Sequence, residues 1–252
     1  MTDRRSVGQV GFWGTDLVAR VTKAPEVRRE ELLDVAFELC RTQGFETMSV
    51  EQVAQAAGVA KGTFYHYFTS KADLQLQLVQ RFGDSLFAHM SARLATATGN
   101  AVDRTRALMQ SATEYKQAER FNLAYAAFLY REENFALRHR VYASWREQAR
   151  LVLLPVIRDG VADGSLSVAD PEGAADIVLL LWFDAADHLW NRALAAADAD
   201  AFAEVMVTGA AAILQAQERI LGAPDGSFAV PIAPQALAVI KALHSRLQEN
   251  QP

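Results

Sequence analysis

The stretch Lys61–Tyr67, written KGTFYHY, gathers side chains that could contact nucleic acid. The phenol and imidazole groups of Tyr65, His66 and Tyr67 can hydrogen-bond to phosphates or stack on sugars. Three consecutive residues of a helix cannot all face one core, so an ordinary buried aromatic cluster explains these residues poorly. Their types and spacing favour a surface that touches DNA.

The residues around these aromatic side chains suit the same contact. Lys61 and Lys71 add positive charge, and Lys71 lies in the first turn of a predicted helix, whose N-terminal amides favour an anion. Gly62 has no side chain, so the backbone can approach phosphates closely. Thr63 offers a hydroxyl group to phosphates or base edges and a methyl group to thymine.

Hydrophobic periodicity and capping signals place these residues on a pair of short helices. The period predicts a helix from Val27 to a turn at Gly44. A capping box of Ser49 and Gln52 opens a second helix, and a short third helix covers Lys61–Phe68. Two short helices joined by a tight turn that contains glycine form a helix-turn-helix, whose second helix enters the major groove.

The stretch Thr47–Leu74 resembles the DNA-binding domain of the TetR/AcrR family of bacterial transcriptional regulators, and the similarity begins at about Val27. The resemblance implies that Ser49 and Lys71 hold backbone phosphates. It also implies that six residues of the third helix line the DNA surface, namely Lys61, Gly62, Thr63, Tyr65, His66 and Tyr67.

Two positions depart from the pattern of this family. Ala60 stands where the family often has serine, so the recognition helix lacks a hydroxyl group at its N-cap. Glu51 faces the DNA side in this arrangement, where a carboxylate repels phosphate unless it accepts a hydrogen bond from a cytosine amino group. These departures bear on the operator sequence and not on the domain assignment.

The rest of the chain is expected to be helical, which predicts an all-α fold. A long helix is expected to open at Lys71, and others over residues 102–119, 122–130, 134–161, 170–195 and 199–221. We expect a flexible arm at 1–25, a helix-turn-helix domain at 26–74, a ligand-binding and dimerisation domain at 75–222, and a C-terminal tail with an amphipathic helix at 223–252.

The resemblance implies a homodimer with a small-molecule effector pocket in each subunit. An apolar stripe from Ile177 to Leu189 and a small-residue stripe from Val205 to Ile213 suit a four-helix bundle across a two-fold axis, although both stripes also suit the core of one chain. Eight residues are candidates to surround an apolar ligand, and each also suits a plain core: Phe82, Met109, Tyr125, His139, Tyr142, Trp145, Trp182 and His188.

Four polar residues share one helix face: Asp184, Asp187, His188 and Asn191. They suit a solvated face first, and a polar pocket wall or a metal site second, because one histidine beside aspartates is a weak metal signal. We expect no metal and no cofactor. The sequence also lacks a nucleophile elbow, a phosphate loop and an HExxH motif, which argues against an enzyme.

The composition sets further limits on function. The net charge of −5 means that any DNA contact is local. The single cysteine, Cys40, lies on the apolar side of a predicted helix, so we expect a buried thiol and a reducing cytoplasm. The apolar run Ile177–Phe183 is too short to span a membrane.

Together these features predict a cytoplasmic, ligand-responsive regulator that binds a palindromic operator in double-stranded DNA and makes no membrane contact. Repression is the usual outcome in similar proteins, so we expect a repressor that its effector releases by shifting the long helix at Lys71. Two alternatives stay open, namely a protein-interaction module whose helix-turn-helix no longer binds DNA and an all-helical enzyme. DNA-binding and turnover assays separate the three.

Overall fold

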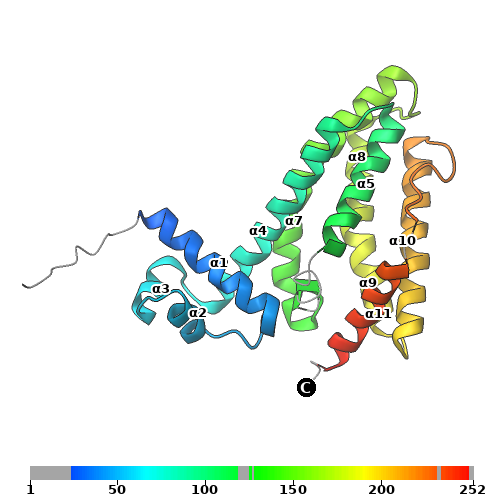
Figure 1. Cartoon of the computed structure of the whole chain (residues 1–252). Coiled ribbons are helices and arrows are strands. Elements are labelled where there is room, and N and C mark those ends of the chain that lie inside the picture. Colours follow the sequence, from blue (N-terminus) through cyan, green and yellow to red (C-terminus); the bar gives the residue numbers. More distant parts are fainter. Residues whose placement is uncertain (1–23, 119–124, 127, 232–233, 250–252) are drawn as a thin grey trace, which may run out of the picture.

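The computed structural model describes residues 24–118, 125, 126, 128–231 and 234–249, and every regular element within them is a helix (Figure 1). The predicted all-α fold is therefore confirmed. The predicted arm at 1–25 lies outside the described residues except for Ala24 and Pro25, and Pro25 opens the first helix. The predicted helix over 122–130 is described only in part, and residues 125, 126, 128 and 129 are helical.

Three helices form the N-terminal unit, α1 (Pro25–Gln43), α2 (Val50–Ala56) and α3 (Lys61–Tyr67). The predicted capping box is confirmed, because Ser49 Oγ accepts from the Gln52 amide at 3.1 Å and Gln52 Oε1 accepts from the Ser49 amide at 2.8 Å. Gly44, at the end of α1, has a φ of 90°, which a residue with a side chain rarely adopts.

An apolar core holds this unit together. The rings of Phe64 and Phe68 lie 5.3 Å apart, and both side chains are fully buried. Cys40 lies beside them in the same core, where its thiol donates to Met48 Sδ at 3.6 Å. The expectation of a buried cysteine is confirmed.

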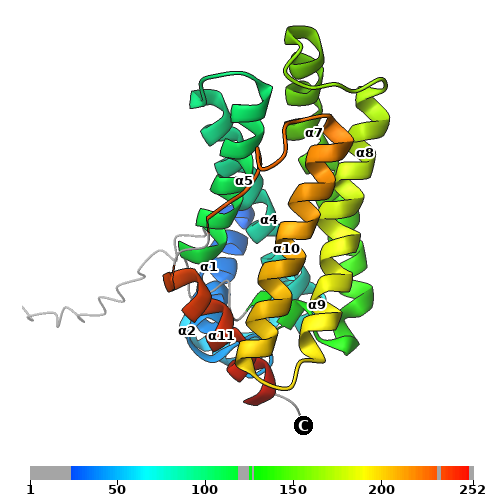
Figure 2. The same cartoon turned by 90° about the vertical axis from the view of Figure 1, so that its right-hand side faces the viewer.

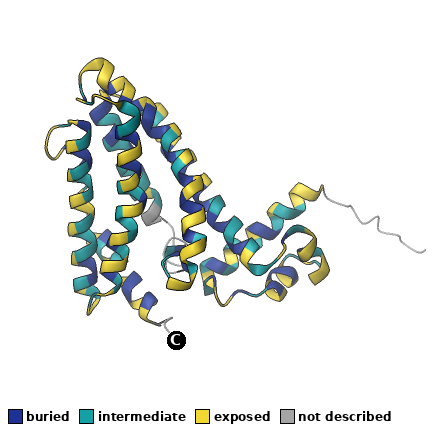
Figure 3. Ribbon diagram, turned by 180° about the vertical axis from the view of Figure 1, so that it is seen from behind, coloured by how far each residue is buried: buried dark blue, intermediate teal, exposed yellow. Residues whose placement is uncertain are grey.

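The long helix α4 (Lys71–Thr96) joins the N-terminal unit to the rest of the chain. Ser70 caps its N-terminus, since Ser70 Oγ accepts from the Asp73 amide at 3.0 Å. Buried side chains occur along α4 from Leu74 to Met90, first against α1 and then against α5 and α7 (Figure 3). One rigid element therefore runs through both halves of the molecule.

The C-terminal unit is a bundle in which α8 and α10 lie side by side and α11 packs across α10 (Figure 2). Its elements after α4 are α5 (Ala101–Ala118), the 3₁₀ turn η1 (Glu132–Asn134), α7 (Phe135–Asp163), α8 (Pro171–Leu180), the π turn η2 (Leu181–Ala185), α9 (Ala186–Leu194), α10 (Ala199–Leu221) and α11 (Pro234–Glu249).

The sequence predicted one uninterrupted helix over 170–195, and this prediction is wrong in its middle. The helix starts as expected, because Asp170 accepts from the Gly173 amide at 3.1 Å. The π turn Leu181–Ala185 then interrupts it, and such a turn changes which side chains share a face. Within the turn, the Trp182 indole donates to Gln217 Oε1 of α10 at 3.0 Å, a tertiary contact that local sequence does not reveal.

By length and composition alone, α10 is apolar enough to cross a membrane, and among the described residues it is the one helix that passes this test. The expectation of no membrane span rested on the shorter run Ile177–Phe183 and did not consider α10. Only 11% of the apolar window of α10 is buried within the chain. The other residues of this window are partly buried or exposed.

The crossing of α4 and α7 depends on a glycine, which gives a first prediction. A Cβ added at Gly83 would overlap the indole ring of Trp145, whereas a Cβ added at Gly62 meets nothing within 4 Å. Gly83→Ala is expected to lower the free energy of unfolding by about 1–3 kcal/mol, because the indole must move. Gly62→Ala is the control. It is expected to raise the free energy of unfolding by no more than about 1 kcal/mol. Denaturant unfolding measures both, and equal stabilities would contradict the packing.

The thiol of Cys40 gives a second prediction, because burial raises its pKa to about 12. Between the unfolded pKa and about 12, the unfolded chain loses this proton first, so stability falls as pH rises through that range. At pH 8 a thiol reagent is expected to label the folded protein more than ~1,000-fold more slowly than the protein in denaturant. Similar labelling rates in both states would show that the core of the N-terminal unit opens readily.

Candidate nucleic-acid interface

The third helix divides its side chains sharply between core and solvent. Phe64 and Phe68 are fully buried and anchor α3, whereas Tyr65 is 50% exposed and His66 is also exposed. The His66 and Tyr67 rings meet edge to face at 5.0 Å. The helix therefore presents polar aromatic groups outward on a fixed backbone.

The other predicted DNA residues lie on α3, at the N-cap of α2 (Ser49) and at the start of α4 (Lys71). Lys61 and Gly62 are exposed, and Thr63, Tyr67, Ser49 and Lys71 are partly exposed. Ser49 Oγ uses a lone pair for its cap, which leaves its hydroxyl proton for a phosphate. Lys71 Nζ donates to the Glu46 carbonyl at 2.6 Å, which leaves two of its three donors.

The two departures from the family pattern have structural counterparts. Ala60 is the N-cap of α3 and makes no side-chain cap bond. Glu51 forms an ion pair with Lys61 across the gap between α2 and α3. The hydrogen bond from Lys61 lowers the pKa of Glu51, and the same bond raises the pKa of Lys61, so both groups are charged near neutral pH.

Four of the eight predicted ligand-contact residues meet in one aromatic cluster, formed by Phe82, Tyr125, Tyr142 and Trp145. The Phe82 and Tyr125 rings stack at 4.3 Å, and Trp145 lies about 6 Å from Phe82, Tyr125 and Tyr142. Burial raises the pKa of Tyr142 to about 12 and that of Tyr125 well above its ordinary value. The cluster is therefore uncharged at neutral pH.

The other four candidates are not part of this aromatic cluster. Met109 is half-buried against the core, and Trp182 is held by its bond to Gln217. The structure does not bring the two histidines to the aromatic cluster, because His139 and His188 are both exposed.

The polar face on α9 and the turn before it is mostly solvated. Asp184, His188 and Asn191 are exposed, and Asp184 pairs with Arg146 of α7. Asp187 instead turns inward to Arg138. Among the described residues, no three acidic, histidine or cysteine side chains lie close enough to hold a metal ion.

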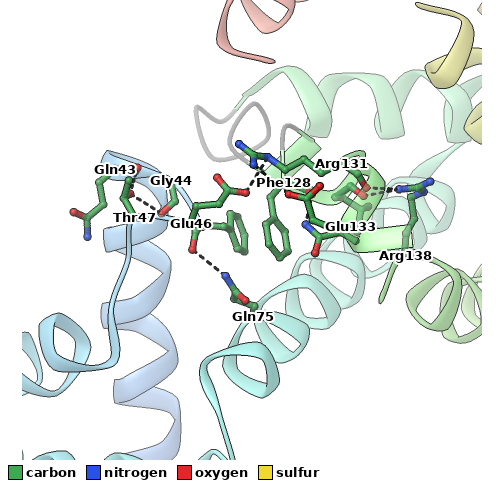
Figure 4. Close-up of polar contacts among 12 residues, drawn as sticks. Gln43, Gly44, Glu46, Thr47, Gln75, Phe128, Arg131, Glu133 and Arg138 are labelled. Atoms are coloured by element: carbon green, nitrogen blue, oxygen red, sulfur yellow. Dashed lines mark hydrogen bonds and ion pairs between the residues drawn. The ribbon is translucent and has the colours of Figure 1, made fainter. Parts of the chain in front are cut away.

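A contact between the two units is absent from the predictions. The Phe45 ring, in the turn after α1, stacks on Phe128 with 4.5 Å between centroids, and both side chains are almost fully buried. Beside this stack, Arg131 Nε lies 3.1 Å from Glu46 Oε1, and Gln75 Nε2 donates to the Phe45 carbonyl at 2.9 Å (Figure 4). The turn between α1 and α2 is thus joined to the segment that precedes α7.

Arg138 connects this segment to the C-terminal unit. It is only 4% exposed and donates to the Leu129 carbonyl at 2.8 Å (Figure 4). It also pairs with Asp187 of α9. Its guanidinium also lies over the Tyr130 ring at 5.3 Å. The sequence contained one indication that Arg138 faces inward. Arg138, Tyr142 and Trp145 are spaced i, i+4 and i+7, so they share one helical face.

The chain is similar in sequence to known proteins. Residues 32–78 match the family described as bacterial regulatory proteins, tetR family. The chain is 29% identical over 147 residues to the HTH-type transcriptional repressor KstR2 of Mycolicibacterium smegmatis, covering 56% of this chain and 68% of that protein. It is 34% identical over 82 residues to the HTH-type transcriptional repressor NemR of Escherichia coli, covering 32% and 41% of the two chains.

Solved structures share the fold at lower identity. A transcriptional regulator from Cytophaga hutchinsonii superimposes with a TM-score of 0.58 at 13% identity, over 73% of this chain and 95% of the other. The regulator FadR from Bacillus subtilis, solved in complex with stearoyl-CoA, superimposes with a TM-score of 0.52 at 15% identity, over 88% and 99%. These likenesses concern the fold.

Proposed function

Because the chain belongs to the TetR family of bacterial regulatory proteins, we propose that it is a homodimeric repressor that its effector releases from a palindromic DNA operator. The observation that carries the DNA-binding role is α3, which exposes Tyr65 and His66 while Phe64 and Phe68 lock its other side into the core. A rigid helix with outward polar groups suits insertion into the major groove. Since its target is chromosomal DNA, we place the protein in the cytoplasm.

The DNA surface that we propose combines positioning and base-reading groups. Ser49 and Lys71 keep spare donors for backbone phosphates, and Lys61 adds a charge at the start of α3. Gly62, Thr63, Tyr65, His66 and Tyr67 approach the groove itself. Phosphate contacts fix the position on the duplex, while contacts with base edges select the sequence.

Two copies would meet through α8 and α10, which lie side by side. Ile177 and Leu180 of α8 are about half exposed, and the segment Ala210–Ala212 of α10 is exposed. Val205 and Gly209 of the expected stripe instead pack within the chain, Gly209 against Leu189. The exposed part of the stripe is what we assign to a four-helix dimer interface.

The effector that we propose is a small apolar or amphipathic molecule that contacts the aromatic cluster of Phe82, Tyr125, Tyr142 and Trp145. Aromatic side chains supply large apolar contact areas, and the phenol and indole groups supply a few polar contacts. Phe82 belongs to α4, which reaches the N-terminal unit, and Tyr125 precedes the segment that holds Phe45 and Glu46. A ligand there would bias both connections at once.

The release mechanism follows from linkage. An effector that binds the cluster best when α4 and the segment Phe128–Arg131 have moved also favours a different position of α3. Operator half-sites fix the spacing of the two recognition helices at about 34–36 Å or a multiple. The moved state then binds the operator more weakly, so the effector releases the DNA.

Tyr65 provides the direct test of DNA binding. Fluorescence anisotropy with labelled DNA from upstream of the protein's own gene is expected to show saturable binding, and Tyr65→Ala to weaken it by roughly tenfold or more, because a hydrogen bond to a charged phosphate is lost. Phe135→Ala is the control, since Phe135 is an aromatic residue of similar exposure on α7. Equal effects of the two substitutions would argue against α3 as the DNA surface.

Arg131 tests the proposed coupling. With a compound that lowers DNA affinity of the wild-type protein, Arg131→Met is expected to weaken that response by up to about fivefold, the size expected for a partly exposed ion pair. DNA affinity without the compound should stay near that of the wild type. Arg158→Met removes a more exposed ion pair, with Glu172 between α7 and α8, and should respond normally. An unchanged response in Arg131→Met would rule out this connection.

A further inference from the structure

The charges of residues 25–74 are arranged unusually for a DNA-binding surface. This segment holds five lysines and arginines against eight aspartates and glutamates, so its sum repels DNA. Each of the five cations also has a partner within the described residues. The pairs are Arg28–Glu31, Arg29–Glu30, Arg41–Glu38 and Lys61–Glu51, and Lys71 donates to the Glu46 carbonyl.

Of these contacts, only Glu51–Lys61 joins α2 to α3. Glu51 is the second residue of α2 and Lys61 the first residue of α3. Both side chains are more than half exposed, so the pair lies open to an approaching duplex. The three arginine pairs lie within α1.

An exposed ion pair of this kind is weak, so a phosphate can take Lys61 from Glu51. The exchange leaves the Glu51 carboxylate beside the DNA without its partner, where it repels phosphates. The repulsion is offset where a base offers a hydrogen-bond donor, and the amino group of cytosine in the major groove is the donor that a glutamate accepts from. At most positions of random DNA the carboxylate meets another base, which leaves it without this hydrogen bond.

We propose that Glu51 is a specificity-determining residue. On random DNA its ion pair keeps Lys61 from binding a phosphate, and the pair opens where a cytosine amino group donates to the Glu51 carboxylate. The inference rests on the proposed DNA-binding function and adds the way in which the same surface rejects wrong sequences. Repulsive groups that act against unwanted partners are a common source of specificity.

The first experiment measures the affinity of the full chain for a labelled random-sequence duplex over a series of salt concentrations. Glu51→Gln is expected to bind about tenfold more tightly than the wild type. The slope of its log affinity against log salt concentration should become more negative by about one, which is the change expected for one added phosphate contact. Glu51→Gln combined with Lys61→Met should lose this gain, because the unmasked cation is gone.

Glu26→Gln is a matched control. Glu26 is also an exposed glutamate at the second position of a helix, and its substitution makes the same change in net charge. It is expected to leave the salt slope at the wild-type value. An equal gain in Glu26→Gln, or a Glu51→Gln protein with the wild-type slope, would overturn the proposal.

The second experiment selects bound duplexes from a random library with the wild type and with Glu51→Gln. The wild type is expected to enrich a cytosine at one position of each half-site, and Glu51→Gln to lose preference at that position alone. If the wild type selects a sequence and Glu51→Gln keeps the full preference, only the role of Glu51 fails. If no variant binds DNA even at low salt, the DNA-binding function itself fails.

Discussion

The stack of Phe45 on Phe128 is the contact on which the position of the recognition helix depends. Phe45 lies in the turn between α1 and α2, so its burial fixes that turn against the segment before α7. Glu46 and Gln75 tie the same turn to Arg131 and to α4. These contacts add a second connection between the N-terminal unit and the rest of the chain to the one made by α4, and in the proposed mechanism a change in the aromatic cluster can reach α3 by either path.

Contacts within each unit are stronger than the ion pairs at the DNA surface and between the units, and this difference suits a protein that changes between a DNA-bound and a released state. Buried apolar packing and the inward pair of Arg138 with Asp187 hold each unit together, and breaking such contacts is costly. The ion pairs at the DNA surface and between the units are at least partly exposed, and such pairs are weak and exchange partners readily. In the proposed mechanism each unit stays folded, these ion pairs change partners, and the buried Phe45–Phe128 stack has to shift for the units to move.

Much of the fold could be predicted from the sequence because its signals are local. Ser49, Ser70 and Asp170 cap the helices that they precede, and Phe64 and Phe68, spaced i and i+4, share one face of the third helix and are both buried. The π turn at Leu181–Ala185 could not be predicted, since the bond from Trp182 to Gln217 joins distant segments. The Phe45–Phe128 stack also joins distant segments, so local sequence does not predict it. For the same reason, local sequence does not exclude His139 and His188 as ligand candidates, although both side chains are exposed.

The proposed function requires that the protein binds a two-fold symmetric DNA site in a sequence-specific way. Selection from genomic DNA is the direct test of this binding. The purified protein would be mixed with sheared DNA from its own organism, and the bound fragments would be sequenced. We expect enrichment of a few fragments that share an inverted repeat with half-sites about one helical turn, or a multiple of it, apart. Fragments without a shared motif, or with a single unrepeated one, would contradict the proposed function.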